Sequence, residues 1–417
     1  MSRWYRRPAV LAWALTAWAN HGFATTVLVG FFPLFLDSYW AAGLPGTRST
    51  LYLGLANSAA SLVVMMIAPW LGAYADRRGQ KKLWLGVCTA LGVACTALLA
   101  VISRGAWPWA LPVFALASIG FYAGSSFQDA LLVQVAAPAE ANRISSYGYA
   151  AGYLGGGLLF LLNVLIALHP AWFGLPDKVA ATRLAFLDVA VWWALFTLPL
   201  FRWVPEAASV AEAPAWQELR ATLRKVFADP TVRGFLLAYW LYIDAIGTLQ
   251  QMAADFGSKL GLPTPALIQA LLLVQFISFP SALYFGRLGD RIGARRAILI
   301  GLGVFLFVTV WALLLRTMWQ FYTLAALVGT VQGGVQSLSR SLYSRLIPRE
   351  RAGEYFGLYN MLGKFAAFLG PLLVGVTATL SGSSRIGVSS LLLLFGAGAV
   401  LLWRVRVPPA AAGSAAA

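Results

Sequence analysis

Twelve long apolar runs, separated by short polar segments, constrain this chain more than any other feature. Each run is close to the roughly 20 residues that a helix needs to cross the hydrocarbon of a bilayer. Backbone polar groups in lipid must be paired within their own segment, so such runs predict helices. The sequence therefore predicts an all-α integral membrane protein, with spans at residues 9–36, 51–75, 82–103, 107–134, 144–168, 184–204, 231–256, 265–287, 296–316, 319–343, 354–380 and 386–404.

Charge predicts the orientation of these spans. Only 11% of the residues are charged, against about 25% in a typical soluble domain. With the N-terminus inside, 23 of the 31 Lys and Arg fall on cytoplasmic segments, as the positive-inside rule requires. We therefore expect a multi-pass protein of a cell membrane, the inner membrane of a bacterium, with both termini cytoplasmic. The net charge of +16 is explained by topology, which argues against nucleic acid as a partner.

A repeated motif divides the chain into two halves. "GAYADRRGQKK" at 72–82 and "GRLGDRIGARR" at 286–296 follow one plan, and each lies between the second and third span of its half. Pro138 and Pro348 mark a second pair of equivalent segments after spans four and ten. We predict two pseudo-symmetric six-helix halves at 1–204 and 231–407, a cytoplasmic linker with an amphipathic helix at 205–230, and a disordered tail at 408–417. Duplicated halves of this kind are typical of secondary transporters, which bind solute between the halves near the bilayer midplane.

The repeated motif suggests a gate. Its first glycine lets a neighbouring helix approach closely, and its aspartate at the cytoplasmic end of a helix needs a positive partner. We expect the N-terminus of a helix in the same half to supply that partner. A contact of this kind could form when the cytoplasmic side closes; the alternative is that the charges only fix topology. The motif residues are Gly72, Asp76, Arg77 and Gly79 in the first half and Gly286, Asp290, Arg291 and Gly293 in the second.

This motif resembles the signature between helices two and three of the major facilitator superfamily, and the twelve-span layout extends the resemblance over the whole chain. The stretches "WANHGFATTVLVGFFPLF", "SSYGYAAGYLGGGL", "LYIDAIGT" and "QSLSRSLYSRLIPRERAGEYFGLYNMLGKFAAFLGP" resemble its vacuole-effluxer-like branch. The resemblance implies the major facilitator fold and the export of amino acids or similar small solutes. Two positions depart from the branch, because Ala17 stands where an acid is expected and Asp129 where an amide is expected.

Polar residues deep in a span are costly and are therefore candidates for function. Asp244 lies near the middle of span seven, and His21, beside Asn20, is its pseudo-equivalent in span one. Lys364 in span eleven has no basic counterpart in span five and could bind a solute carboxylate or neutralise Asp244. For each of these residues the alternative is a structural hydrogen bond to a neighbouring helix.

Asp129 in span four and Arg340 in span ten lie at similar depth in opposite halves. We predict that they pair as an inner gate, although Arg340 could instead extend its guanidinium to the cytoplasmic surface. Uncharged hydrogen-bonding groups on the helices expected to line the cavity suit a polar or zwitterionic solute. Gln336 is the one assigned to the site, and the others are Asn57, Gln128, Gln250, Gln251 and Gln332.

The leading hypothesis is a secondary transporter of a small polar solute such as an amino acid, working by alternating access as an exporter. Its expected partners are the solute, protons and the bilayer, and we expect a monomer. The sequence offers no clustered catalytic groups, metal-ligand spacing or nucleotide signature, so we expect neither an enzyme nor a cofactor. The alternatives are a plain facilitator, an exporter of drugs or amphiphiles, and a non-transporting sensor on a transporter frame.

Overall fold

The computed structural model describes residues 4–44, 46–206, 215–259, 263–381 and 384–406. Within these ranges the side chains at 46–47, 50, 215–219, 251–259, 264, 364–368 and 384–385 are not described. The regular elements of the described chain are helices throughout, which confirms the predicted all-α class.

The first half holds six long helical spans. The first span runs through α1 (Pro8–Gly22), η2 (Phe23–Phe31), α2 (Phe32–Phe35) and η3 (Leu36–Trp40). The other five are α3 (Gly46–Arg78), α4 (Lys81–Leu99), α5 (Trp107–Ala130) with α6 (Leu132–Val135), α7 (Ala141–Leu168) and α8 (Lys178–Trp203).

The second half repeats this plan. Its spans are α10 (Pro230–Lys259), α11 (Thr264–Ile292), α12 (Ala294–Leu313), α13 (Met318–Leu346), α14 (Ala352–Ser381), and α15 (Ser384–Ser389) with α16 (Leu391–Arg404). Between the halves lies α9 (Ala215–Ala228), inside the segment predicted as a linker. Ten helices of the described chain meet a strict length and apolarity criterion for crossing a membrane. The remaining two spans are α13, which is rich in polar residues, and α14, whose described apolar stretch is Leu369–Ser381.

The first span differs from the regular helix expected at 9–36. It continues to Trp40, and both η2 and η3 are π-helical. Pro33, which lies between these two π-helical segments, has no backbone N–H to donate, so a regular ladder is interrupted there. π-Helical turns carry an extra residue and are frequent at functional sites, and this one contains Thr25 and Thr26.

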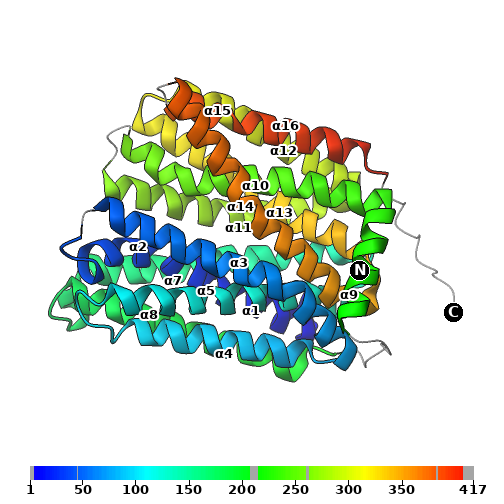
Figure 1. Cartoon of the computed structure of the whole chain (residues 1–417), viewed down its shortest axis with the longest axis horizontal. Coiled ribbons are helices and arrows are strands. Elements are labelled where there is room, and N and C mark those ends of the chain that lie inside the picture. Colours follow the sequence, from blue (N-terminus) through cyan, green and yellow to red (C-terminus); the bar gives the residue numbers. More distant parts are fainter. Residues whose placement is uncertain (1–3, 45, 207–214, 260–262, 382–383, 407–417) are drawn as a thin grey trace.

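The two halves lie against each other, and most of their helices run along the length of the bundle, whereas α14 crosses obliquely from the second half toward the first (Figure 1). Helix α7 of the first half packs against α11 and α13 of the second, and α3 packs against α14. The N-terminus and α9 lie at the same end of the bundle (Figure 1), which we call the α9 end. These two contacts between halves, the α7 seam and the α3 seam, position the polar groups described below.

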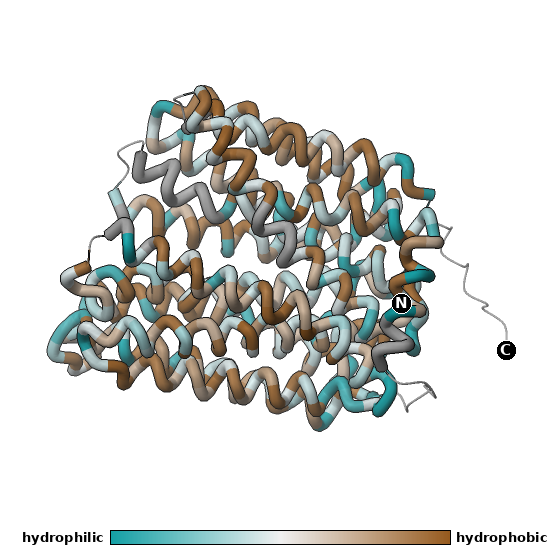
Figure 2. The backbone as a smooth tube through the Cα atoms, viewed as in Figure 1, coloured by the Kyte–Doolittle hydropathy of each residue, from teal (hydrophilic) through white to brown (hydrophobic). Residues whose placement is uncertain are grey.

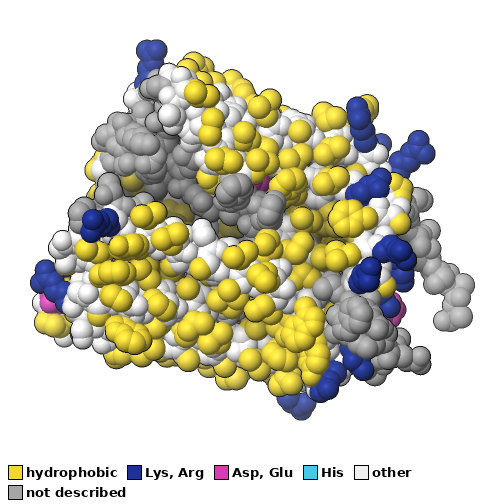
Figure 3. Space-filling view, in the orientation of Figure 1, with side chains coloured by type: hydrophobic (Ala, Val, Ile, Leu, Met, Phe, Trp, Pro, Cys, Tyr) yellow, Lys and Arg dark blue, Asp and Glu magenta, His cyan; other side chains and the backbone are white. Residues whose placement is uncertain are grey.

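The outer surface matches a lipid environment. Hydrophobic side chains cover the long sides of the bundle, and Lys and Arg gather at the α9 end of the face shown in Figure 3. Hydropathy along the backbone follows the same pattern, with apolar helices and hydrophilic residues toward their ends (Figure 2). Large apolar side chains such as Met66, Val191 and Leu393 are more than half exposed, as expected where lipid is the solvent.

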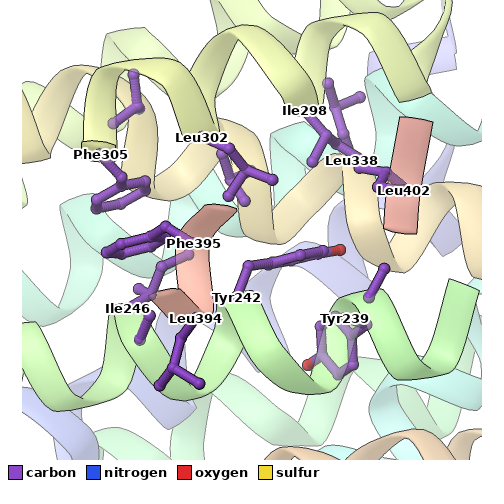
Figure 4. Close-up of a cluster of buried hydrophobic side chains, with 14 of the residues drawn as sticks. Tyr239, Tyr242, Ile246, Ile298, Leu302, Phe305, Leu338, Leu394, Phe395 and Leu402 are labelled. Atoms are coloured by element: carbon purple, nitrogen blue, oxygen red, sulfur yellow. The ribbon is translucent and has the colours of Figure 1, made fainter. Parts of the chain in front are cut away.

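Each half also has an apolar core of its own. In the second half, Tyr242 of α10, Leu302 and Phe305 of α12 and Phe395 of α16 are fully buried together (Figure 4). The rings of Phe305 and Phe395 stack with centroids 5.2 Å apart. The second-half cluster also takes in Ala130 and Val133 of the first half. A separate apolar cluster within the first half includes Phe23, Phe114 and Trp193.

Candidate functional site

Asp76, at the end of α3, is buried and holds the α3 seam. Its carboxylate accepts hydrogen bonds from the backbone N–H groups of Gly353 (3.0 Å) and Glu354 (2.7 Å), in the first turn of α14. Lys81 forms an ion pair with the same carboxylate at 2.5 Å, and its side chain is only 4% exposed. The expectation of a helix N-terminus in the same half is wrong, because α14 belongs to the second half. The first N–H groups of α14 have no acceptor within their own helix. They donate to Asp76 instead, and the positive end of the helix dipole lies beside the carboxylate.

Asp290, the equivalent residue at the end of α11, holds the α7 seam. It accepts a hydrogen bond from Asn142 at 3.1 Å and forms an ion pair with Arg143, both in the first turn of α7. This contact also crosses between halves, so the same correction applies. It is more open than the first, since the Arg143 side chain is 40% exposed. The two motif aspartates therefore make reciprocal contacts with the opposite half.

The motif glycines have two roles: two of them end the helices, and the other two allow close contact with the opposite half. Gly79 and Gly293 have φ of 61° and 88°, which end α3 and α11 in tight turns that favour glycine. Gly72 lies so close to α14 that a Cβ there would be 2.3 Å from the carbonyl oxygen of Gly353. Gly286 contacts a side chain instead, because its Cβ would lie 2.8 Å from the Cβ of Ser146. The α3 seam is thus a backbone-to-backbone contact and the α7 seam a side-chain contact.

We expect Asp76→Asn to destabilise the protein more than Asp290→Asn. The first change leaves Lys81 buried beside a neutral partner and weakens two hydrogen bonds to a charged group, which we set at about 2 kcal/mol. The second removes a half-exposed pair, worth about 1 kcal/mol or less. Thermal unfolding of the two purified variants, each measured against wild type, checks the order. Equal losses would contradict the difference between the seams.

Asp129 and Arg340, paired in the sequence-based hypothesis, are in contact. Arg340 Nη1 donates to Asp129 Oδ1 at 2.8 Å, and the side chains are 5% and 12% exposed. Asn360 of α14 donates to the other carboxylate oxygen at 3.1 Å. The guanidinium does not extend to the cytoplasmic surface. The pair joins α5 of the first half to α13 and α14 of the second.

The other two guanidinium nitrogens of Arg340 also donate to neighbouring groups. Arg340 Nε and Nη2 donate to the hydroxyl and carbonyl oxygens of Ser145, at 2.9 and 2.8 Å. Its carbon Cζ lies 4.8 Å from the ring centroid of Trp13 and 4.4 Å from that of Tyr149. Cation–π contacts of this kind are strongest where water is excluded. Arg340 is therefore fixed mainly by residues of the opposite half.

A serine-rich stretch of α13 continues the α7 seam toward the α9 end. Ser145 donates to the carbonyl oxygen of Ser337 at 2.7 Å, and the hydroxyls of Ser146 and Ser337 are 2.9 Å apart. Asn142 Oδ1 accepts from Ser341 at 2.7 Å and from Arg345 at 3.2 Å. Asn142 thus connects this stretch to Asp290, and short side chains keep the two helices close.

Amide side chains meet a tyrosine one turn farther from the α9 end. The Tyr153 hydroxyl of α7 donates to Gln336 Oε1 at 2.9 Å and accepts from Gln332 Nε2 at 3.1 Å. Gln275 of α11 donates to the Thr25 hydroxyl in η2 at 2.6 Å. The four helical segments involved meet near the middle of their lengths. Gln336 was assigned to the site from the sequence, but its partner Tyr153 was not.

His21 and Asn20 lie on α1 beside these groups. The His21 Nδ1 atom is 3.0 Å from the Ala17 carbonyl oxygen, and the ring contacts those of Tyr149 and Tyr153 at centroid distances of 6.1 and 5.4 Å. Asn20 donates to Gln128 Oε1 at 2.6 Å within the first half. His21 therefore borders both the charged pair and the amide cluster, whereas Asn20 braces α1 against α5.

Asp244 is buried and bonded to backbone. Its carboxylate accepts from the Gly370 N–H of α14 at 2.7 Å, beside Pro371, and Thr248 lies at 3.5 Å. This is the structural hydrogen bond to a neighbouring helix that was weighed as the alternative. The Lys364 side chain lies outside the described residues, so its proposed pairing is not described. Of the other motif residues, Arg77 is half-buried at the end of α3 and Arg291 is exposed at the end of α11.

Comparison with known proteins places this architecture in a family. A family model described as vacuole effluxer Atg22 like matches residues 134–413, and one for the Major Facilitator Superfamily matches residues 2–160. An uncharacterised MFS-type transporter, YxiO of Bacillus subtilis, is 36% identical over 94% of this chain and 93% of its own length. The chain belongs to the Atg22-like branch of the major facilitator superfamily.

Fungal relatives are more distant. Autophagy-related protein 22 of Yarrowia lipolytica is 25% identical over 68% of this chain. That of Gibberella zeae is 28% identical over 64% of it. The Atg22-like transporter described here spans 54% and 44% of their lengths, about half.

Solved structures support the fold. The human organic anion transporter MFSD10 (TETRAN) is 17% identical with a TM-score of 0.74, covering 96% of this chain and all of its own. The proton:xylose symporter XylE is 15% identical with a TM-score of 0.71, covering 96% and 94%. The transporter FucP in its outward conformation is 12% identical with a TM-score of 0.73, covering 97% and 100%. The twelve-helix major facilitator fold predicted from the sequence is confirmed.

Proposed function

We propose that this Atg22-like transporter is a secondary active transporter that exports a small polar solute, an amino acid or a similar molecule. The proposal takes the α9 end as cytoplasmic, because the positive charges gather there. The two halves would open in turn at that end and at the other. Protons are the proposed coupling ion.

The observation that carries the proposal is the position of the contacts between halves. The inter-half bonds named above run from the motif aspartates at the α9 end to Tyr153 and to Gln275 with Thr25, near the middle of the bundle. These bonds are hydrogen bonds and ion pairs between side chains or between a side chain and a helix end. Such bonds can break and form again with little change in the helices themselves. This arrangement fits a state that is closed on the cytoplasmic side, with the Asp129–Arg340 pair as the innermost charged part of the gate.

The chemistry of the groups between the halves supports a polar solute. Near the middle of the bundle, the polar groups at the contact between the halves include the Asp129 carboxylate, the Arg340 guanidinium, glutamine amides, hydroxyls and the His21 imidazole. An entirely apolar solute would leave such groups without hydrogen-bond partners. An amino acid would match them with its own charged and polar groups. The description of the matching family model, vacuole effluxer Atg22 like, supports export as the direction of transport.

We expect purified protein in proteoliposomes to move at least one radiolabelled amino acid, faster with an imposed pH gradient, and Asp244→Asn to abolish the effect of the gradient. Asn keeps an acceptor oxygen for the Gly370 N–H but cannot carry a proton, so folding should survive. Asp177→Asn, the same change at an exposed carboxylate that caps α8 by accepting from the Ala180 N–H at 2.8 Å, is the matched control. Amino-acid transport that is unaffected by the pH gradient and by the substitution would show that the protein is a facilitator. No movement of any amino acid would overturn the proposed solute.

A further inference from the structure

We infer that facing positions on α7 and α13, together with Asp129 of α5, form a two-tier recognition strip for a zwitterion whose short side chain carries a neutral hydrogen-bonding group. The charged tier is Asp129 with Arg340, and the amide tier is Gln332, Gln336 and Tyr153. The inference rests on the proposed transport of amino acids and narrows it to a chemical class.

Helical spacing builds the strip. On α13, Gln332, Gln336 and Arg340 follow one another at intervals of four residues, so they share one face. On α7, Ser145, Tyr149 and Tyr153 do the same in the opposite chain direction. The contacts pair the two rows, since Arg340 meets Ser145 and Tyr149 while both glutamines meet Tyr153. Along α13, Arg340 is therefore about 6 Å from Gln336 and about 12 Å from Gln332, and along α7 Tyr149 is about 6 Å from Tyr153.

The charged tier selects a zwitterion when the halves separate. Asp129 belongs to the first half and Arg340 to the second, so opening the α9 end pulls them apart. Each half would then present one unpaired charge inside the membrane, which is unfavourable. A solute with one ammonium and one carboxylate neutralises both at once, while a solute with a single charge leaves one of them exposed. The same pair thus closes the empty gate and receives the charged ends of the solute.

The amide tier selects for the side chain of the solute. Gln332 is 93% buried, since only 7% of its surface is accessible, and its Oε1 atom has no hydrogen-bond partner among the described residues. A buried acceptor without a donor is costly, so this atom favours a solute that brings an N–H or O–H group. The described members of this tier carry no charge. Carboxamide or hydroxyl side chains therefore suit it, and ionised side chains do not.

The test compares near-isosteric solutes in proteoliposomes of the full chain. Radiolabelled glutamine is measured against glutamate, which has the same length and an added charge, and against alanine, which has no side-chain donor. We expect glutamine to be moved fastest. Gln332→Met keeps the length of the side chain but removes its amide, and Tyr153→Phe removes the hydroxyl that holds both glutamines. We expect each variant to lower glutamine transport about fivefold, the contribution of roughly one hydrogen bond, while alanine transport stays within about twofold.

Tyr322→Phe is the matched control. It also removes a hydroxyl bonded to a glutamine, Gln269 at 2.7 Å, but both residues belong to the second half. We expect it to leave the glutamine-to-alanine ratio unchanged. If alanine and glutamine are moved equally by wild type, or if Gln332→Met lowers both alike, the strip is overturned while amino-acid transport stands. If no amino acid is moved, the proposed function itself falls. Thermal unfolding of each variant separates loss of recognition from loss of folding.

Discussion

Replacing Arg340 with leucine is expected to destabilise the purified protein by about 3 to 5 kcal/mol and to abolish solute transport. Arg340 is the partner of Asp129 at 2.8 Å, and both side chains are nearly inaccessible to solvent. Without it, Asn360 is the one side chain among the described residues that still donates to Asp129, so an uncompensated carboxylate remains buried within the membrane. The midpoint of thermal unfolding in detergent measures the first effect, and flux into proteoliposomes measures the second.

The double variant Asp129→Asn with Arg340→Gln separates charge from packing. It removes both charges and keeps hydrogen-bonding groups of similar size, so we expect it to recover most of the lost stability while transport stays low. With Asp129→Asn and Arg340→Gln also measured as single variants, a double-mutant cycle gives the coupling energy of the pair. An Arg340→Leu protein as stable as wild type would mean that the pair is not buried in the folded state.

The contact between Asp129 and Arg340 could be expected from the sequence because two independent constraints fix it. Span boundaries set the depth of each residue, and the internal repeat places spans four and ten at equivalent positions. A charge of each sign at the same depth then has one favourable partner. Its role in gating remains a proposal.

Lys81, the charged partner of Asp76, belongs to the motif itself, but the partners of Asp76 in the opposite half could not be predicted from the sequence. They are backbone N–H groups of Gly353 and Glu354, and a backbone group has no residue-type signature. The motif shows that a carboxylate lies at a helix end, but it does not show which helix N-terminus approaches it. The error in assigning that helix to the same half comes from this gap. Asp244 is a similar case, because its partner is the Gly370 N–H.

Tyr153 was also missed as a site residue. Tyrosine is common in apolar spans and at membrane interfaces, so its type alone gave no signal. The four-residue spacing of Gln332, Gln336 and Arg340 on one helix and of Ser145, Tyr149 and Tyr153 on the other was readable in the sequence. The sequence does not show that the two rows face each other, because this depends on how the halves pack.

The second large effect is expected from Gly72→Val, which should hold the α9 end of the transporter open. A Cβ at position 72 would lie 2.3 Å from the oxygen and 2.7 Å from the carbon of the Gly353 carbonyl group. These are backbone atoms, so no side chain can turn aside, and α3 must move away from α14. Farther along the same seam a Cβ at Gly357 would lie 2.7 Å from the Ala68 carbonyl oxygen, which leaves little room to slide.

Labelling of Ser341→Cys measures the opening, in a protein whose Cys88 and Cys95 are replaced by alanine. Ser341 is fully buried between the halves in the closed state. If the seams open together, a shift of 1.4 kcal/mol toward the open state should raise the rate of reaction with a water-soluble thiol reagent about tenfold. Gly303→Val is the control, because a Cβ there meets nothing within 4 Å among the described residues.

Comparison with Gly286→Val then distinguishes the two seams. At position 286 the nearest obstacle is the Ser146 side chain, which can give way more easily than backbone. If the halves move as rigid units, blocking either seam opens both, and the backbone seam has the larger effect because it cannot adjust. Equal labelling of the Gly72 and Gly303 variants would show that α14 yields at Gly353 without separating the halves. The α3 seam would then be a deformable contact, and the closed state would depend on the α7 seam and its charged pair.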